Sequence, residues 1–426
     1  MMQMFIGQKI NIQKILGLVP DDLLATLSKD TKVDYCAKVL YGQRIFNLLL
    51  YGLLTTERTS QRSLEDLFKS NLFKTMFSYD AGMKISHSSI SARLSTIEPE
   101  FFRLAYEAIY KEFSKLYTPA EQLKHRIIRV DSSMVAETCN KLKKGLSPGN
   151  KKNKNPDKVV KQVKYTIAFD GLSACDFNVY TDPCYTSEDR AIPEVVWMNA
   201  SREGSKSNIY TFDRGVASHA KFSSFTDGHV SFVGRLKTNR RYEVVSVDQP
   251  KEEEKDLGAL ILVSSQVVHL YGKNSKVDKE HSYRLIIARR KEEIDTTPPK
   301  NKGKVKKKEN IFFFLTNEME LNPKEIADIY KQRWDIEVFF RFIKQELNVS
   351  HFLSVSENGI KVILYMTLIA SMLLLLYKKI NDLGYKTAKR RFTIELWEAV
   401  VTVIVKECGG DPALMNKTYY RKFAVP

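Results

Sequence analysis

The sequence predicts a mixed α/β protein with an α-helical N-terminal part, a β-rich middle and further helices near the C-terminus. Apolar residues recur at three- and four-residue steps up to about residue 120, and short β-branched runs begin at about residue 125. From Pro323 onward the helical spacing returns. With 426 residues, 43% of them hydrophobic, the chain can form two or three packed units with a sizeable core.

Residues 1 to 120 are predicted to form a helical N-terminal DNA-binding domain, with apolar residues spaced as in Leu23, Leu24 and Leu27. The segment 84–94 places several serines before a helix that carries Arg93. Short hydroxyl residues are natural N-caps and phosphate donors, so the segment fits either the second helix of a helix-turn-helix or an ordinary capped helix. His87 is expected to be a surface or cap residue.

Strands are predicted from residue 126 onward, where the apolar spacing changes to short β-branched runs. The predicted strands are 126–130, 160–169, 174–180, 208–212 and 230–236, followed by a β-rich insertion from about 240 to 310 with strands at 242–247, 259–268 and 282–288. Two basic segments, 141–158 and 300–308, are predicted to be exposed loops. They are either solvated loops or arms that contact a polyanion.

Helices are predicted again at about 323–348, 360–380 and 393–406, and residues 381–426 are expected to form a C-terminal helical tail. The apolar run 362–377 falls short of the roughly 20 residues that cross a bilayer. We therefore expect a buried core helix rather than a membrane span. The first residues lack the apolar stretch of a secretory signal, so export is not expected.

The charge balance makes nucleic acid the leading partner. Lys and Arg total 67 against 50 Asp and Glu, a formal net charge of +17, and the pI is about 9.4. Composition alone fits a ribosome-associated or merely basic protein equally well. Five scattered cysteines with no Cys-x-x-Cys pair predict neither a disulfide framework nor a zinc ribbon and suit the cytoplasm.

Two acids follow predicted strands. Asp131 comes after 127–130, and Asp213 comes after 209–212. In an α/β sheet the strand ends converge on a cleft, so both are candidates for a site. Either one alone is more often a turn or cap residue.

A third acid is predicted on the helix near residue 337. At roughly 100° per residue, one stripe of about 80° contains Tyr330, Arg333, Glu337, Arg341 and Lys344. Asp335 projects about 160° away from Glu337, so Glu337 is the candidate. The alternative is a simple ion pair of Glu337 with Arg333 or Arg341.

Three carboxylates suit hard divalent cations such as Mg²⁺. Two such ions about 3.5–4 Å apart activate an attacking oxygen and stabilise the leaving oxygen at one phosphorus. The cations of the same stripe would then bind the flanking phosphates.

The pattern Tyr330-x-x-Arg333-x-x-x-Glu337-x-x-x-x-x-x-Lys344 resembles the Y-(2)-R-(3)-E-(6)-K signature of insertion-sequence transposases of the IS4 group, a branch of the DDE transposases. Segments 213–215, 232–237 and 315–317 resemble neighbouring motifs of that family, and the resemblance covers roughly residues 125–380.

The resemblance implies an RNase H-like catalytic domain at 121–380, with its β-rich insertion between the second and third acids. It implies a DDE triad of Asp131, Asp213 and Glu337 that binds two Mg²⁺ ions, with Mn²⁺ as a substitute and no small-molecule cofactor. Water would attack at the transposon end, and the freed 3′-hydroxyl would then attack target DNA. The implied partners are double-stranded DNA and a second copy of the chain in the synaptic complex, in the bacterial cytoplasm.

The resemblance also assigns DNA contacts. Tyr330, Arg333 and Lys344 would contact the transposon-end backbone, and further expected contacts are Arg341, Arg214, Arg235 and Lys237. Where some relatives have a base-stacking Trp, this chain has 311–314, in which Phe312 either stacks on a base or packs in a buried strand. Val216 replaces a usual aromatic residue. The alternative functions are an RNase H-like nuclease or resolvase, a catalytically inactive DNA-binding relic and a membrane-anchored protein.

Overall fold

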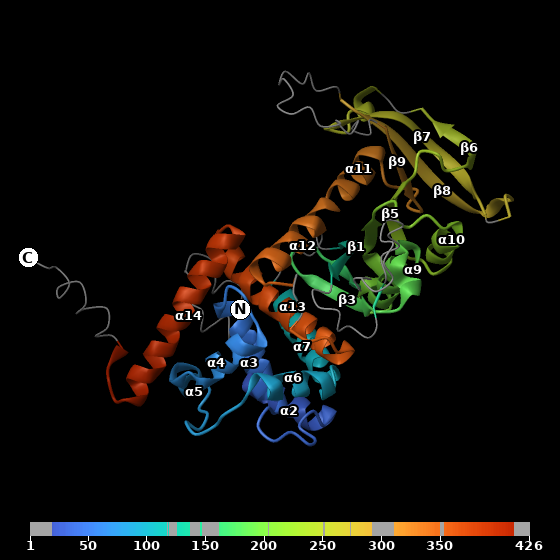
Figure 1. The fold of residues 1–426 in the computed structure, drawn as a ribbon. Coiled ribbons are helices and arrows are strands. Elements are labelled where there is room, and N and C mark those ends of the chain that lie inside the picture. Colours follow the sequence, from blue (N-terminus) through green and yellow to red (C-terminus); the bar gives the residue numbers. More distant parts are fainter. Residues whose placement is uncertain are drawn as a thin grey trace, which may run out of the picture.

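Figure 1 shows a computed structural model of the 426-residue chain. It describes residues 19–116, 118, 126–136, 145–146, 162–202, 204–249, 252–272, 274–291, 311–349 and 353–412. The basic segment predicted at 300–308 lies outside the described residues, as does all of 141–158 except residues 145–146.

The strands of the described chain form one nine-stranded sheet in the order β3-β2-β1-β4-β5-β9-β8-β7-β6. Its strands are β1 (Ile127–Ala136), β2 (Gln162–Phe169), β3 (Ala174–Tyr180), β4 (Ile209–Phe212), β5 (Ser231–Leu236), β6 (Tyr242–Asp248), β7 (Leu260–Tyr271), β8 (Val277–Arg290) and β9 (Ile311–Thr316). Short 3₁₀ helices span Pro183–Thr186, Ser205–Ser207 and Glu252–Lys255.

The first five strands confirm the predicted RNase H-like core. β1, β2 and β3 are antiparallel neighbours, whereas β4 runs parallel to β1 and β5 runs parallel to β4. The strand order 3-2-1-4-5 with a helix before β4 and another before β5 is the RNase H-like arrangement. The parallel pairs use helical crossovers because parallel strands cannot be joined by a tight hairpin.

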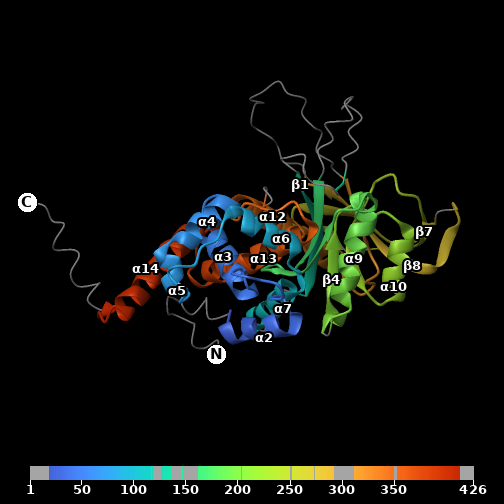
Figure 2. The same cartoon turned by 60° about the horizontal axis from the view of Figure 1, so that its bottom comes forward.

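Helices cover both faces of this core. On one face lie α9 (Glu188–Ala200) and α10 (His219–Asp227), whose apolar side chains pack with those of β1, β4 and β5. On the other face lie α11 (Pro323–Lys331) and α12 (Trp334–Glu346). There the ring of Phe339 stacks on Phe169 at 4.7 Å between centroids. Figure 2 shows α9 alongside β1 and β4.

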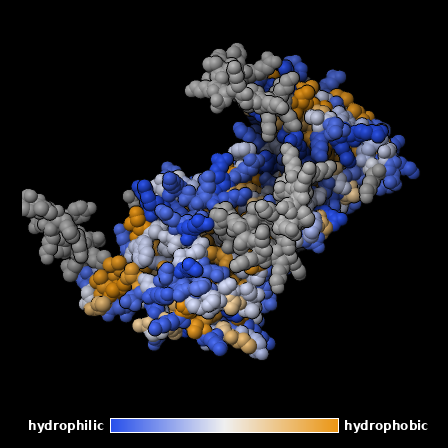
Figure 3. Space-filling model, in the orientation of Figure 1, coloured by the Kyte–Doolittle hydropathy of each residue, from blue (hydrophilic) through white to orange (hydrophobic). Residues whose placement is uncertain are grey.

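The β-rich insertion extends the same sheet. Strand β9 pairs with β5 on one side and with β8 on the other, so β8, β7 and β6 continue the core sheet outward. These three strands lie between Asp213 and Glu337 in the sequence, as the family resemblance implies. In Figure 3 hydrophobic residues gather over the outer strands, whose exposed side chains include Val244, Val247 and Val263.

The remaining helices pack together around one apolar core. They are α2 (Asp21–Thr31), α3 (Gly42–Thr55), α4 (Gln61–Lys69), α5 (Asn71–Met76), α6 (His87–Thr96), α7 (Glu100–Ser114), α13 (Glu357–Ile380) and α14 (Tyr385–Glu407). The C-terminal helix α13 contacts α3, α6 and α7 of the N-terminal region. Segments far apart in the sequence therefore share this core, as Figure 1 shows.

The long apolar helix is α13, and it is the buried core helix that the sequence predicts. By length and composition it could cross a bilayer, but 89% of its most apolar window is buried inside the protein. Leu368, Met372 and Leu373 are at most 1% exposed. Neighbouring helices, rather than lipid, cover this apolar surface.

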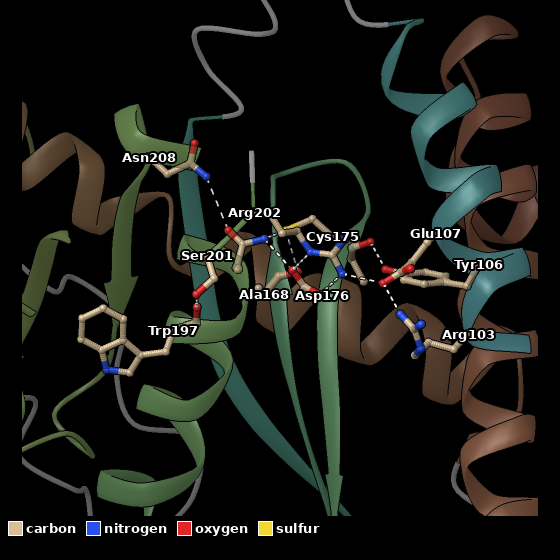
Figure 4. Close-up of polar contacts among 12 residues, drawn as sticks. Arg103, Tyr106, Glu107, Ala168, Cys175, Asp176, Trp197, Ser201, Arg202 and Asn208 are labelled. Atoms are coloured by element: carbon tan, nitrogen blue, oxygen red, sulfur yellow. Dashed lines mark hydrogen bonds and ion pairs between the residues drawn. The ribbon is translucent and has the colours of Figure 1, made fainter. Parts of the chain in front are cut away.

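A polar network joins α7 to the RNase H-like core (Figure 4). The guanidinium of Arg202 donates two hydrogen bonds to the buried Asp176 of β3, at 2.7 and 2.6 Å, and a third to Glu107 of α7 at 2.9 Å. Asn199 also donates to Asp176 at 2.8 Å, and Arg103 pairs with Glu107 at 2.7 Å. Both oxygens of the buried Asp176 carboxylate accept hydrogen bonds, and Arg202 connects this carboxylate to Glu107 of α7.

The N-terminal region has a capped helix at the segment that the sequence analysis singled out. Helix α6 begins with a capping box between Ser86 and Ser89, and His87 contacts Glu65 as a cap residue would. Arg93 donates to the main-chain oxygens of Leu40 and Val33. Arg93 is therefore tied to the loop between α2 and α3, and the segment has the structure of a capped helix, as one of the two alternatives predicts.

The single helix predicted at 323–348 is also wrong, because it is divided into α11 and α12. Gln332 and Arg333 keep a right-handed backbone, but the hydrogen bonds across them include contacts three residues back. The buried Arg129, 1% exposed, donates to the main-chain and side-chain oxygens of Gln332 at 3.2 and 2.6 Å. The main-chain oxygen of Gln332 thus accepts a hydrogen bond from a residue of β1 at the point where the helix is interrupted.

Candidate active site

The two strand acids lie at the same level of the sheet. In the parallel ladder Arg129 is level with Thr211, so Asp131 and Asp213 each stand two residues beyond this pair. Asp213 follows the end of β4 as predicted. Asp131 was expected at a strand end, but it lies in the middle of β1, which continues to Ala136 by pairing with β2.

Alternation along the strands directs both acids toward α11 and α12. Val130 and Phe212 pack into the core beneath α9 and α10, so the acids that follow them face the opposite side. The hydroxyl of Tyr330 on α11 donates to Oδ1 of Asp213 at 3.1 Å. One nitrogen of Arg333 lies 3.6 Å from Oδ2 of Asp131.

Arg333 joins the third acid to the first. It forms an ion pair with Glu337, with Nη2 2.6 Å from Oε1, while its other terminal nitrogen faces Asp131. The i, i+4 ion pair weighed in the sequence therefore exists, and it lies inside the predicted site. The buried Nε of Arg333 has no hydrogen-bond partner among the described residues, so a donor remains for a ligand.

The helix wheel separates the two neighbouring acids correctly. Asp335 points away from the site and lies 3.2 Å from the buried guanidinium of Arg129. Glu337, two residues later, faces Arg333 and the strand acids. The break in the helix does not change this separation, because both residues lie within α12.

Burial dominates the electrostatics of the site. It raises the pKa of Asp131 from 3.8 to about 6; the Ser132 N–H and Arg333 oppose this shift, and the charges of Glu188 and Asp213 add to it. Burial also raises the pKa of Tyr330, assisted by Asp213. Burial lowers the pKa of Lys344, against the attraction of Asp131. Within the described residues, the attraction between Lys344 and Asp131 is the one link between this lysine and the strand acids.

The donors present suit a hard divalent cation. Asp131, Asp213 and Glu337 supply only carboxylate oxygens, the ligand type that Mg²⁺ and Mn²⁺ prefer. Burial, the main cause of the raised pKa of Asp131, disfavours its negative charge, and a bound cation would compensate that charge. In the DNA-free chain Arg333 supplies part of this compensation.

The other predicted DNA contacts are spread more widely. Arg341 is exposed on α12. Arg235 lies over the ring of Phe312, 4.7 Å from its centroid, and Arg290 lies on the same ring at 5.5 Å. Phe312 is half-buried and stacked with Phe314. Here the ring packs within the strand, as one of the two alternatives predicts.

Arg214 and Lys237 lie together in a different place. Both line a cavity of about 340 Å³ that is also lined by Arg240 and Arg241. The cavity is formed by the segment after Asp213, the turn after β5 and the turn between β7 and β8. It forms a basic surface next to the second acid.

Sequence reasoning missed Glu188, the first residue of α9. Its carboxylate lies 2.7 Å from the Ser132 hydroxyl and 2.9 Å from the Nζ of Lys164, which is completely buried. An acid at the start of a helix normally indicates favourable charge at the helix N-terminus. A sequence signal that could have revealed it is Lys164, a charged residue within a strand that is largely apolar.

A second group of possible metal ligands lies outside this site. Asp278, Glu280 and His281 lie close together on β8, where Asp278 also bonds to His219 of α10. His281 bridges Asp278 and Asp227. Through these hydrogen bonds the group links α10 to strand β8 of the insertion, which explains its position without a metal ion.

The strand order and the three converging acids define an RNase H-like protein with a carboxylate site. The chain belongs to the Transposase DDE domain family, whose model matches residues 122–373. Asp131, Asp213 and Glu337 all lie within the matched segment. Membership of this family implies that the site uses a divalent metal ion.

Individual relatives carry names that describe them as transposases. The chain is 27% identical over 172 residues to y4zB of Sinorhizobium fredii, covering 40% of this chain and 43% of that protein. It is 29% identical over 167 residues to a protein of the insertion sequence element IS5377 of Geobacillus stearothermophilus, covering 38% and 37% of the two chains. A match of 32% over 74 residues to a protein of the element IS4SA of Synechocystis covers 16% and 22%.

The chain therefore spans less than half the length of each of these relatives. Among solved structures, it is similar to the piggyBac transposase synaptic complex with hairpin DNA, at 11% identity and a TM-score of 0.46. That similarity covers 100% of this chain and 88% of the other.

Proposed function

We propose that the protein is the DNA transposase of an insertion sequence, which cleaves the ends of its element and joins the freed 3′-hydroxyls to target DNA. The observation that carries this proposal is the convergence of Asp131, Asp213 and Glu337 with Tyr330, Arg333 and Lys344 on one face of an RNase H-like sheet. A nuclease needs the acids; the aligned cations and Tyr330 suit an enzyme that holds a particular DNA end.

Asp131, Asp213 and Glu337 would hold two Mg²⁺ ions, with Mn²⁺ as a substitute. When bound, these ions would supply an activated oxygen nucleophile and stabilise the leaving oxygen. The protein's own contribution is to hold the DNA so that the scissile phosphate lies at the three carboxylates. The largely buried setting of Asp131 supports metal binding, since a bound cation would compensate a carboxylate charge that burial disfavours.

Arg333 and Lys344 would bind phosphates on either side of the scissile bond. Arg333 presents a planar fork with one nitrogen still unbonded among the described residues, whereas Lys344 presents a point charge. When DNA enters, the phosphates compete with Asp131 and Glu337 for Arg333, so its contacts to these acids would be exchanged for phosphate contacts. Tyr330 would keep Asp213 in place through its 3.1 Å hydrogen bond.

The rest of the DNA would run over the basic surfaces. Arg341, Arg214, Arg235 and Lys237 would contribute contacts, and the net charge of +17 supports a polyanionic partner. Residues 1–120 would act as the helical DNA-binding domain, 121–380 as the catalytic domain and 381–426 as a C-terminal helical tail. Joining two ends requires two active sites, so a homodimer would form on DNA in the cytoplasm.

The test uses the DNA that flanks the gene in its own genome as a labelled substrate. Wild type and Asp131→Ala are compared with and without Mg²⁺. Wild type alone should cut, only with metal, at an inverted-repeat boundary. Metal-dependent cutting that ignores the boundary would favour the nuclease or resolvase alternative. DNA binding with no cutting by either protein would favour a DNA-binding relic.

A further inference from the structure

The back of the catalytic sheet carries a buried charge that the metal and DNA contacts do not use. Lys164 of β2 is 0% exposed, and its Nζ lies 2.9 Å from Oε1 of Glu188 and 3.1 Å from the Thr186 carbonyl oxygen. A fully buried ammonium is costly to desolvate, and hydrophobic residues often replace such pairs with no loss of stability. A costly pair that lies directly behind an active site is more easily explained by function than by stability.

Glu188 connects this lysine to the strand that bears the first acid. Its Oε2 accepts a hydrogen bond from the Ser132 hydroxyl at 2.7 Å, and the same hydroxyl lies 2.8 Å from Thr166 on β2. Ser132 follows Asp131, and its main-chain N–H donates to Oδ1 of Asp131 at 2.7 Å. The carboxylate of Glu188 therefore fixes the residue whose backbone orients Asp131.

The same turn of α9 also fixes the segment that follows the second acid. A Cβ atom at Gly215 would lie 2.7 Å from Cβ and Cγ of Glu188, so the chain after Asp213 passes directly against this side chain. Asp189 accepts hydrogen bonds from the N–H groups of Ala217 and Ser218 at 2.6 and 2.9 Å. Adjacent acids on one helix thus contact β1 and the segment that follows Asp213.

We propose that Lys164, Glu188 and Asp189 form a brace behind the sheet, with Glu188 as a positioning residue that sets the separation of Asp131 and Asp213. This proposal rests on the proposed function of the site. Side-chain alternation places Ser132 on the α9 face and Asp131 on the opposite face, so the brace acts through the backbone. Loss of the brace lets the two acids drift, which weakens their shared binding of a divalent ion.

The test measures Mn²⁺ binding to the DNA-free protein by isothermal titration calorimetry, alongside DNA binding in EDTA. Glu188→Ala should raise the half-saturating Mn²⁺ concentration roughly tenfold or more, as loss of an orienting residue around a metal site does. DNA affinity in EDTA should be unchanged. The matched control is Glu194→Ala on the same helix, whose carboxylate bonds to Asn178. It should leave Mn²⁺ binding unchanged.

Glu188→Gln separates position from charge. Its amide can still accept from Lys164 and contact Ser132, so the brace predicts that Mn²⁺ binding stays within about threefold of wild type. An equal loss in the Gln and Ala variants would overturn the proposal, because Glu188 would then act through its charge alone. Equal Mn²⁺ binding by Glu188→Ala and Glu194→Ala would overturn it as well.

Ser132→Ala keeps the proposal testable if Glu188→Ala does not fold. It removes only the hydroxyl that links Glu188 to β1 and should also weaken Mn²⁺ binding; unchanged binding would contradict the brace. Failure of the brace and failure of the proposed function are distinguished by whether wild type cleaves DNA in the flanking-DNA assay. If wild type cuts and the brace variants bind Mn²⁺ normally, only the brace is wrong. If wild type neither binds Mn²⁺ nor cuts, the proposed function itself fails.

Discussion

Replacing Asp131 with Asn should stabilise the metal-free protein at pH 8. Asp131 is largely buried, with 23% of its side chain exposed, and its pKa in the folded protein is raised to about 6 from an ordinary value of 3.8. Above pH 6 the group is ionised in both the folded and the unfolded chain, and the folded chain bears the cost of burying the charge. The difference in pKa corresponds to about 3 kcal/mol of folding free energy.

The sign of the pH dependence follows from proton binding. Between about pH 6 and pH 4 the folded chain binds a proton that the unfolded chain does not, so wild type gains stability as the pH falls. At pH 5 about half of its disadvantage, or about 1.4 kcal/mol, should have disappeared. The advantage of Asp131→Asn should therefore shrink from pH 8 to pH 5.

The assay is urea unfolding in EDTA at both pH values. The control is Asp66→Asn, whose side chain is 78% exposed on α4 and should change little. If Asp131→Asn destabilises the protein at pH 8, or if its advantage grows as the pH falls, the account of Asp131 as an under-compensated buried acid is incorrect.

Two further predictions concern the arginines of the site and of the interface with the helical region. Arg333→Ala should weaken binding to the element's end and lower the slope of log affinity against log salt by about 1; an unchanged slope in salt titrations would exclude a phosphate contact. Arg202→Ala leaves the buried Asp176 without its main partner and should cost about 3–5 kcal/mol in urea unfolding. Arg103→Ala removes a partner of Glu100 and Glu107, which are far more exposed than Asp176, and should cost no more than about 1 kcal/mol. Equal losses of unfolding free energy in these two variants would contradict the conclusion that the burial of Asp176 sets the cost.

The sequence predicted the parts of the site that depend on local periodicity. Strand β3 was predicted with its observed bounds, and the helix wheel distinguished Glu337 from Asp335 because both lie on one regular helix. Asp213 was placed after β4 because Arg214 and Gly215, which follow it directly, interrupt the strand pattern. Burial of α13 was inferred from the short apolar run 362–377, although the complete helix is long and apolar enough to cross a bilayer.

Features that depend on tertiary contacts were not predictable in this way. The break at Gln332 arises from Arg129, which is more than 200 positions away in the sequence. Strand β1 runs past Asp131 because β2 offers a partner, and a single-strand pattern does not reveal such pairing. Glu188 joins the site only because the topology brings the start of α9 behind β1 and β4.

The assignment of Glu337 is tested most directly by comparing Glu337→Gln with Asp335→Asn. The two acids lie two residues apart on α12, and each substitution keeps the size and the hydrogen-bonding oxygen of the side chain. We expect Glu337→Gln to bind the element's end like wild type and to cut none of it, while Asp335→Asn both binds and cuts. Cleavage by Glu337→Gln, or loss of cleavage only in Asp335→Asn, would contradict the assignment of Asp131, Asp213 and Glu337 as the catalytic acids.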